Sequence, residues 1–186
     1  DVPLNPKSIK SSNLYPGTKD PLVVVIQPSM GFGTGHHPTT RLSLWALQQL
    51  DLHKQTLIDV GTGSGVLALT AAYLGADHVV AIDNDSDAIL AAKRNLSLAK
   101  TSKVRLLNID LKNASFPQKD FLISNLSADL LTQESRKIEA LSKQKLILSG
   151  FTVSEEAAVL SVFSSWKLQH RIKEDEWVGI VLARNF

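Results

Sequence analysis

The sequence predicts an α/β fold: a doubly wound, mostly parallel seven-stranded sheet that ends in an antiparallel hairpin at the C-terminus. Three observations lead to this prediction. Short apolar runs alternate with stretches of helical period along most of the chain. One of these runs, 57–60, passes through a glycine-rich turn directly into an apolar helix. Two extended runs, 167–172 and 177–183, close the chain without a helical period between them, which is typical of a hairpin.

The strands and helices are expected in alternating order, as parallel sheets require. Strands are expected at 57–60, 79–82, 104–109, 121–124 and 146–148, before the two strands of the hairpin. Helices are expected from about residue 40 to 51, at 66–74, from the caps at 85–87 to about 96, at 127–141 and at 154–165. A β-branched run predicts one further strand at 22–26.

Length and composition are those of one globular domain. The chain has 186 residues, of which 44% are hydrophobic and 20% charged, enough for a substantial core. Residues 1–21 are rich in proline and small polar residues and are expected to form a linker or N-terminal arm, with residues 22–186 as the domain. The absence of cysteine excludes disulfides, thiolate zinc sites and a cysteine nucleophile.

The charge pattern bears on partners and location. The formal net charge is +2, and acidic and basic residues are mixed along the chain, which argues against a large nucleic-acid interface. The densest basic run, 167–173, is expected to be a solvent-exposed strand. Because no apolar run approaches 18 residues and no secretory leader is recognisable, we expect no membrane segment and a cytoplasmic location.

The glycine turn after the run 57–60 indicates a nucleotide-like ligand. Gly61, Gly63 and Gly65 permit a tight turn and close approach of the backbone, and the helix that follows adds free N–H groups. The third glycine comes one residue earlier than in the dinucleotide pattern G-x-G-x-x-G, and the lysine of a P-loop is missing. The sequence therefore favours a ligand without a pyrophosphate.

Polar residues at the ends of the predicted strands form the rest of the candidate site: Asp59, Asp83, Asp110 and Asn125. Ligands of open α/β sheets bind at this edge. Asp83 follows Gly61 by 22 residues, the spacing at which an acidic side chain accepts hydrogen bonds from ribose hydroxyls. A second glycine-rich loop, 28–40, leads into the first helix at Thr39 and Thr40 and is expected to border the same cleft.

These motifs resemble those of a known family. The run 59–65 with Asp83 is similar to motif I and the second-strand acid of class I S-adenosylmethionine-dependent methyltransferases, which have a Rossmann-like fold. Four further segments, 31–40, 125–130, 148–150 and 174–177, resemble the ribosomal protein L11 methyltransferase family in order and separation. Family members carry a separate N-terminal substrate-recognition domain, whereas only about 21 residues precede the domain here.

The resemblance implies roles for particular residues. The positions that contact the cofactor match Thr40, Gly61, Asp83 and Asn125, and the motif also includes Asp59, Gly63 and Gly65. Two residues keep two interpretations each. Asp110 either meets the adenine amino group or caps a turn, and Phe32 either lines the methyl channel or anchors its loop.

Asn125 bears on the acceptor atom. Methyltransferases that act on adenine N6 or glutamine carry N-P-P-Y or a close variant here, whereas this sequence reads N-L-S-A. An amine is therefore the favoured acceptor, with Asn125 orienting it. His36 and His37 have no obvious third ligand, so no metal is expected, and His53, His78 and His170 are expected at the surface. The three tryptophans, Trp45, Trp166 and Trp177, are expected in the core.

The resulting hypothesis is a protein methyltransferase that uses S-adenosylmethionine. The expected acceptor is an amine, a lysine side chain or an α-amino group, of a large-subunit ribosomal protein. Three alternatives remain open at this point. They are a related methyltransferase for another protein or small amine, a non-catalytic module that binds the same cofactor, and a nicotinamide dehydrogenase.

Overall fold

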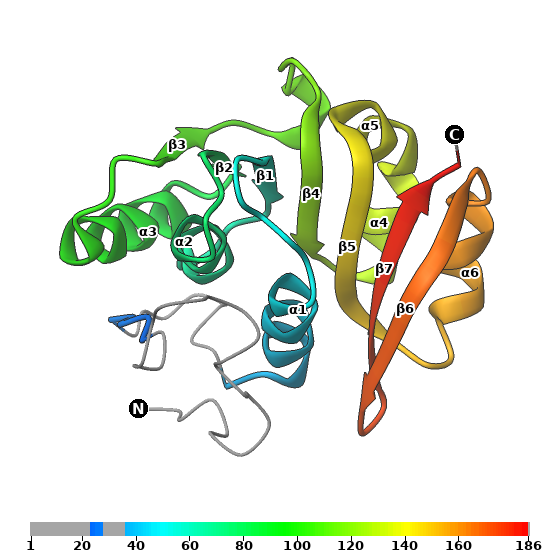
Figure 1. Ribbon diagram of the computed structural model, residues 1–186. Coiled ribbons are helices and arrows are strands. Elements are labelled where there is room, and N and C mark those ends of the chain that lie inside the picture. Colours follow the sequence, from blue (N-terminus) through cyan, green and yellow to red (C-terminus); the bar gives the residue numbers. More distant parts are fainter. Residues whose placement is uncertain (1–22, 28–35, 186) are drawn as a thin grey trace.

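Within the part of the chain that the structure describes, seven strands form one sheet, and the positions of their ends decide where a ligand can bind. The computed structural model describes residues 23–27 and 36–185 (Figure 1). The strands are β1 Thr56–Val60, β2 His78–Asp83, β3 Val104–Asn108, β4 Lys119–Asn125, β5 Ser142–Thr152, β6 Trp166–Glu174 and β7 Trp177–Arg184. Their order is β3-β2-β1-β4-β5-β7-β6, with β1 to β5 parallel and β7 antiparallel to both of its neighbours. The predicted fold class is confirmed, including the C-terminal hairpin.

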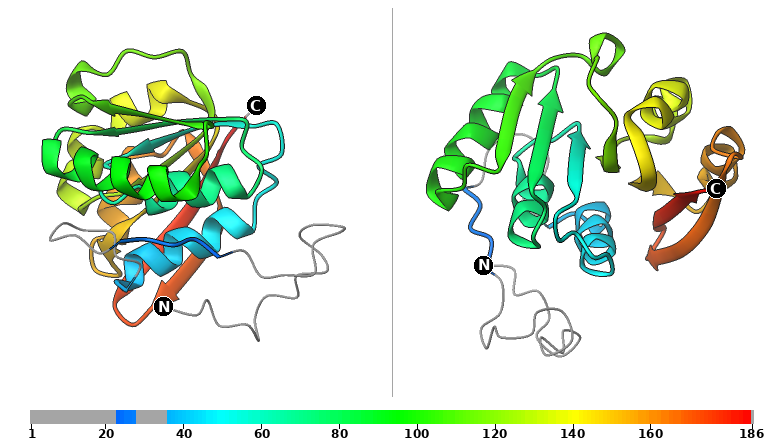
Figure 2. Two further views of the ribbon diagram at one scale, coloured as in Figure 1. Left: turned by 90° about the vertical axis from the view of Figure 1, so that its left-hand side faces the viewer. Right: turned by 45° about the horizontal axis from the view of Figure 1, so that its top comes forward.

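Helices cover both faces of this sheet. In Figure 2, α1 Pro38–Gln48, α2 Val66–Tyr73 and α3 Ser86–Ala99 lie on one side, and α4 Ala128–Gln133, α5 Ser135–Leu141 and α6 Glu156–Val162 on the other. Neighbouring strand residues supply the two cores in alternation, as the pleat requires. Leu57 and Val79 pack under the first layer, whereas Ile58 and Val60 pack under the second. No helix of the described residues is long and apolar enough to span a bilayer.

The helix predicted at 127–141 is two helices in the structure. Glu134 interrupts it with φ −100° and ψ 13°, so that α4 ends at Gln133 and α5 starts at Ser135. The Thr132 hydroxyl bonds the carbonyl groups of Ala128 and Asp129 at 2.9 and 3.0 Å. Such back-bonding by a hydroxyl competes with the main-chain ladder and bends helices. The apolar period alone does not reveal this bend.

Strand β5 is much longer than the predicted strand 146–148. Its first four residues, 142–145, are polar and carry no apolar signal, but this segment pairs with β4. At its other end the strand continues beyond residue 148 through a bulge at Gly150 and ends at Thr152. The register with β7 shifts between Ser149 and Phe151, and Gly150 adopts φ +102°.

The strand predicted at 22–26 is wrong for the described part of that segment. Residues 23–27 have no regular secondary structure. Val23 and Val25 are 69% and 65% exposed, and Ile26 packs against the first core. The described part of the β-branched run therefore packs on the domain through Ile26 without joining the sheet. The expected arm, residues 1–21, lies outside the described residues.

Candidate functional site

The carboxyl ends of β1, β2 and β4 meet at one edge of the sheet. Asp59 lies in β1, Asp83 ends β2 and Asn125 ends β4. The chain passes from β1 outward to β2 and β3, and then returns to pair β4 with the other side of β1. Ligands of open α/β sheets bind at such a switch in strand order. The topology therefore brings together three of the residues that the sequence singled out.

The glycine turn requires backbone angles that only glycine adopts freely. Gly61, Gly63 and Gly65 have φ values of +74°, +53° and +82°. A Cβ atom on Gly61 would lie 2.6 Å from Cδ2 of Leu126, in the loop after β4. The turn is therefore packed directly against the residue that follows Asn125.

Asp59 lies beneath this turn and is completely buried. Its Oδ2 accepts a hydrogen bond of 2.6 Å from the hydroxyl of Thr62. Burial raises the pKa of Asp59 to about 7, against the lowering effect of hydrogen bonds from Thr62 and the Ala68 main chain. The side chain is thus placed to hold the turn from below.

Asp83 ties the turn to the second strand. One carboxylate oxygen accepts from the N–H of Gly63 at 2.9 Å and the other from the N–H of Asp85 at 3.0 Å. Asp85, as expected, is the N-cap of α3 and accepts from Asp87. Each carboxylate oxygen has two lone pairs, and Asp83 is only partly buried, so it retains acceptor capacity toward solvent.

Asp110 caps a short turn. It is the N-cap of the 3₁₀ helix Leu111–Asn113, and its Oδ1 accepts from the N–H of Lys112 at 2.8 Å. The capping interpretation is therefore confirmed, while a contact with adenine stays a prediction.

Thr40 and Asn125 meet although 85 residues separate them. Nδ2 of Asn125 lies 3.4 Å from Oγ1 of Thr40, which is almost fully buried in the first turn of α1. The N–H of Thr40 already bonds the carbonyl of His37 at 3.0 Å. The main-chain N–H of Thr40 is therefore already bonded within the protein, whereas its hydroxyl can still donate to a ligand.

The backbone after Asn125 is held by β5 and β7. Leu126 donates to the carbonyl of Ser149 at 3.1 Å, and the Ser149 hydroxyl donates to the carbonyl of Val178 at 3.0 Å. A Cβ atom on Gly150 would lie 2.3 Å from the carbonyl oxygen of Leu126. A glycine is therefore needed beside the site, as well as within the turn.

Sequence reasoning missed Asn95, which is 1% exposed in α3. Its Nδ2 donates to the carbonyl of Ser64, in the glycine turn, at 2.9 Å. Its Oδ1 accepts from the N–H of Gln27 at 2.8 Å. A signal was present, because Asn95 lies three residues after Ala92 on the apolar side of that helix. This side chain links the turn to the segment that precedes residues 28–35.

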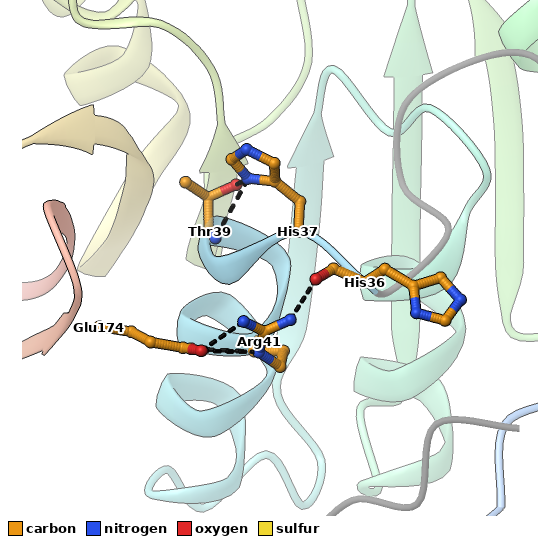
Figure 3. Close-up of polar contacts among 5 residues, drawn as sticks. All are labelled: His36, His37, Thr39, Arg41 and Glu174. Carbon is orange, nitrogen blue, oxygen red and sulfur yellow. Dashed lines mark hydrogen bonds and ion pairs between the residues drawn. The ribbon is translucent and has the colours of Figure 1, made fainter.

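The histidines and tryptophans differ in part from expectation. His37 is the N-cap of α1, where its Nδ1 accepts from the N–H of Thr39 (Figure 3). Its ring also meets the ring of Trp177 edge-on. Within the described residues no three metal-binding side chains cluster. His53, His78 and His170 are exposed, which confirms their surface positions.

Trp166 is buried as predicted, whereas Trp45 is 42% exposed and Trp177 is only partly buried, so the predictions for Trp45 and Trp177 are wrong. Phe32 lies outside the described residues.

Comparison with known proteins agrees with this geometry. Residues 8–185 match the family described as "Ribosomal protein L11 methyltransferase (PrmA)". A protein named ribosomal protein L11 methyltransferase from Lactobacillus gasseri is 30% identical over 174 residues, covering 91% of this chain and 55% of that protein. The chain thus spans about half the length of the curated relatives it matches.

Two solved structures share the fold. The crystal structure of a ribosomal protein L11 methylase from Lactobacillus delbrueckii subsp. bulgaricus superposes with a TM-score of 0.84 at 25% identity, covering 94% of this chain and 91% of that one. A magnesium protoporphyrin IX methyltransferase from Synechocystis with bound SAH superposes with a TM-score of 0.60 at 15% identity, covering 77% and 80%.

The fold is that of the Rossmann-like methyltransferases. Within that class, the chain belongs to the ribosomal protein L11 methyltransferase family.

Proposed function

We propose that this domain transfers a methyl group from S-adenosylmethionine to an amine nitrogen of ribosomal protein L11, either a lysine side chain or an α-amino group. Family membership supports the reaction class and the acceptor. The observation that carries the proposal is the convergence of Asp83, the glycine turn and the Thr40–Asn125 pair at the switch point. A cytoplasmic location and a ribosomal partner belong to the same proposal.

The residues present suit this cofactor. The partly exposed Asp83 has acceptor capacity for two ribose hydroxyls, and the turn of Gly61, Gly63 and Gly65 allows close approach of the backbone. The buried Thr40 offers its hydroxyl for the methionine portion. Asp110 would accept from the adenine amino group with the lone pairs that its cap leaves free. Asp59 would act by holding the turn, because it has no exposed surface.

The bound cofactor supplies an activated methyl group, because its positively charged sulfonium sulfur is a good leaving group. The protein then needs mainly to align the amine, and such alignment corresponds to effective molarities of about 10⁵ to 10⁸ M. The amine must reach the site neutral. Asn125 orients it by accepting its N–H with the side-chain carbonyl, while Nδ2 remains on Thr40. Phe32 lies outside the described residues and keeps both interpretations, as a residue that lines the methyl channel or as the anchor of its loop.

The proposal is tested by incubating the protein with radiolabelled S-adenosylmethionine and purified L11, with a second large-subunit protein as control. We expect label on L11 alone, at amine nitrogens located by mass spectrometry. Label on other proteins or on small amines would mean a different acceptor. Cofactor binding in calorimetry without label on any acceptor would identify a non-catalytic module instead.

Asn125→Ala separates binding from transfer. We expect S-adenosylhomocysteine affinity within about 3-fold of wild type and a methyl-transfer kcat at least about 30-fold lower, because the alignment of the amine is lost. Asn108→Ala is a matched control, since that residue ends β3 and its Nδ2 donates to the carbonyl of Asp83. An Asn125→Ala protein with normal kcat would remove the proposed role.

A further inference from the structure

The turn between β6 and β7 contacts the first turn of α1 at two points. Nε of Arg41 donates to both carboxylate oxygens of Glu174 at 3.0 and 3.1 Å, and Nη2 binds the same carboxylate (Figure 3). The ring of His37 lies edge-on to Trp177, with the ring centroids 4.8 Å apart. Glu174 and Trp177 are themselves cross-strand partners. One strand pair therefore holds α1 at positions 37 and 41.

The end of the β6–β7 hairpin is connected through the sheet to the carboxyl end of β4, where Asn125 lies. Its loop consists of only Asp175 and Glu176. The carbonyl of Glu176 accepts from the N–H of Val153 at 2.8 Å, just after β5. Within the sheet, Asn125 of β4 pairs with Ser149 of β5, and Ser149 in turn pairs with Gly179 of β7. Hydrogen-bonded strands thus connect the hairpin end to Asn125.

Helix α1 instead packs on one face of the sheet, over β5 and β7, and carries Thr40 to the end of β4. The Thr40–Asn125 distance of 3.4 Å is near the upper limit for a hydrogen bond, so a small shift of α1 would break the contact. Arg41 also donates to the carbonyl of His36, just before the N-cap. Its cation lies in the first turn of a helix, where the dipole disfavours positive charge, and Glu174 compensates for it.

We propose that Arg41 and Glu174 are positioning residues, which set the place of Thr40 relative to Asn125 and so tune cofactor binding and methyl transfer. This inference rests on the proposed function. The two residues act through α1 and need not touch the ligand. The acidic turn that ends the family pattern, 174–177, thereby acquires a role at the site, although it lies at the end of a peripheral hairpin.

The chain offers a matched control in a second ion pair. Arg171, also on β6, binds Glu156 of α6 through Nε and Nη2, each at 2.6 Å. Residues 171 and 174 are three apart in the strand, so the second pair lies on the opposite face of the sheet. The same substitutions at the two pairs thus remove the same chemistry, but only one pair holds α1.

The test compares Arg41→Met and Glu174→Gln with Arg171→Met and Glu156→Gln in the full chain. We expect S-adenosylhomocysteine to bind about 3- to 5-fold more weakly in the first two variants, the scale of a partly exposed ion pair. Their kcat should fall as well, whereas the control variants should stay within about 1.5-fold of wild type. Arg41→Lys should restore part of the affinity, because it keeps the charge but loses the two-pronged contact. Equal effects at both pairs, or none, would overturn the proposal.

A second measurement does not depend on the proposed function. The side-chain amide of Asn125 reports its contact with Thr40 through its nuclear magnetic resonance shifts in the ligand-free protein. We expect these resonances to move toward free-asparagine values in Arg41→Met and Glu174→Gln and to stay in place in the controls. Unmoved resonances would refute the positioning role. If the wild-type protein binds no cofactor but the Asn125 resonances still move in Arg41→Met and Glu174→Gln, only the proposed function is refuted.

Discussion

The two ends of the parallel strands use the same residue type in different ways. At the amino ends, Oδ2 of Asp120 accepts from the N–H and hydroxyl of Thr56 at 2.8 and 2.7 Å, and Oδ1 accepts from Gln144 at 3.3 Å. At the carboxyl ends, Asp59 and Asp83 hold a turn. The first arrangement joins three neighbouring strands to one another. The second shapes a loop next to solvent, which is what a binding site needs.

The pKa values show the same contrast. For Asp120, burial raises the pKa, but the hydrogen bonds from Thr56, with help from Lys143 and Gln144, outweigh it and lower the pKa overall. For Asp59, burial outweighs the hydrogen bond from Thr62, and the pKa rises. A carboxylate with many donors is stabilised as a charge, whereas a fully buried one with few donors favours its proton. The binding edge therefore carries an electrostatic cost that the opposite edge does not.

The largest expected effect is the pH dependence caused by Asp59. Its pKa is higher in the folded than in the unfolded chain, so its stabilisation is complete below about pH 4 and is lost as the pH rises to 7. We expect the unfolding free energy of wild type to fall by up to about 4 kcal/mol over this interval relative to Asp59→Asn. Urea titrations at several pH values measure it.

Asp120 should show the opposite sign. Its lowered pKa gives stability that is present above its ordinary pKa and is lost as the pH falls below it. Asp120→Asn should therefore differ from wild type most at neutral pH and least in acid. If the unfolding free energy of wild type, Asp59→Asn and Asp120→Asn changes with pH in the same way, the electrostatic contrast between the two ends of the strands is contradicted.

A glycine substitution at each edge tests the packing of the site. Gly150 and Gly75 have nearly equal φ values of +102° and +105°, but a Cβ would meet the Leu126 carbonyl oxygen at 2.3 Å in the first case and His53 Cα at 3.5 Å in the second. Gly75→Ala should cost about 1 to 2 kcal/mol through backbone strain alone. Gly150→Ala should cost about 3 kcal/mol or more and reduce methyl transfer.

Thermal or urea unfolding measures the cost in each glycine variant, and an assay of methyl transfer measures the displacement of Asn125. Full activity in a folded Gly150→Ala protein would mean that the backbone after Asn125 tolerates this displacement.

The next effect concerns binding. Asp83→Asn should weaken S-adenosylhomocysteine about 100-fold in calorimetry, because charge-assisted bonds to two hydroxyls and the anchor of Gly63 are impaired together. Asp120→Asn should leave the affinity within about 2-fold, since that carboxylate faces the other edge. Equal affinities in the two variants would contradict the assignment of ribose to Asp83.

The smallest effect is expected from Thr56→Val. The substitution keeps the shape but removes the hydroxyl that donates to Asp120 and accepts from its N–H at 3.1 Å. We expect a loss of about 1 kcal/mol in unfolding free energy, with cofactor affinity unchanged. A change in affinity would show that the amino edge is coupled to the site.

Much of the site could be predicted because its parts are local. The five-residue turn 61–65 requires positive φ values at Gly61, Gly63 and Gly65, and Asp83 follows at the end of the next strand. The cap at Asp85 was equally readable, because a cap is a contact over two residues. Predictions failed where a neighbour distant in sequence decided the outcome. Residues 23–27, for example, do not join the sheet, and no other element buries Trp45.

By itself, the sequence determined the order of strands and helices, the glycine turn and the acids at strand ends, because these depend on backbone angles and side-chain period within a few residues. Only the tertiary structure decided that Thr40 meets Asn125, that Asn95 bridges Gln27 to the turn, and that Arg41 pairs with Glu174 across 133 residues. Such contacts depend on how helices pack on the sheet, and a local pattern carries no record of that geometry.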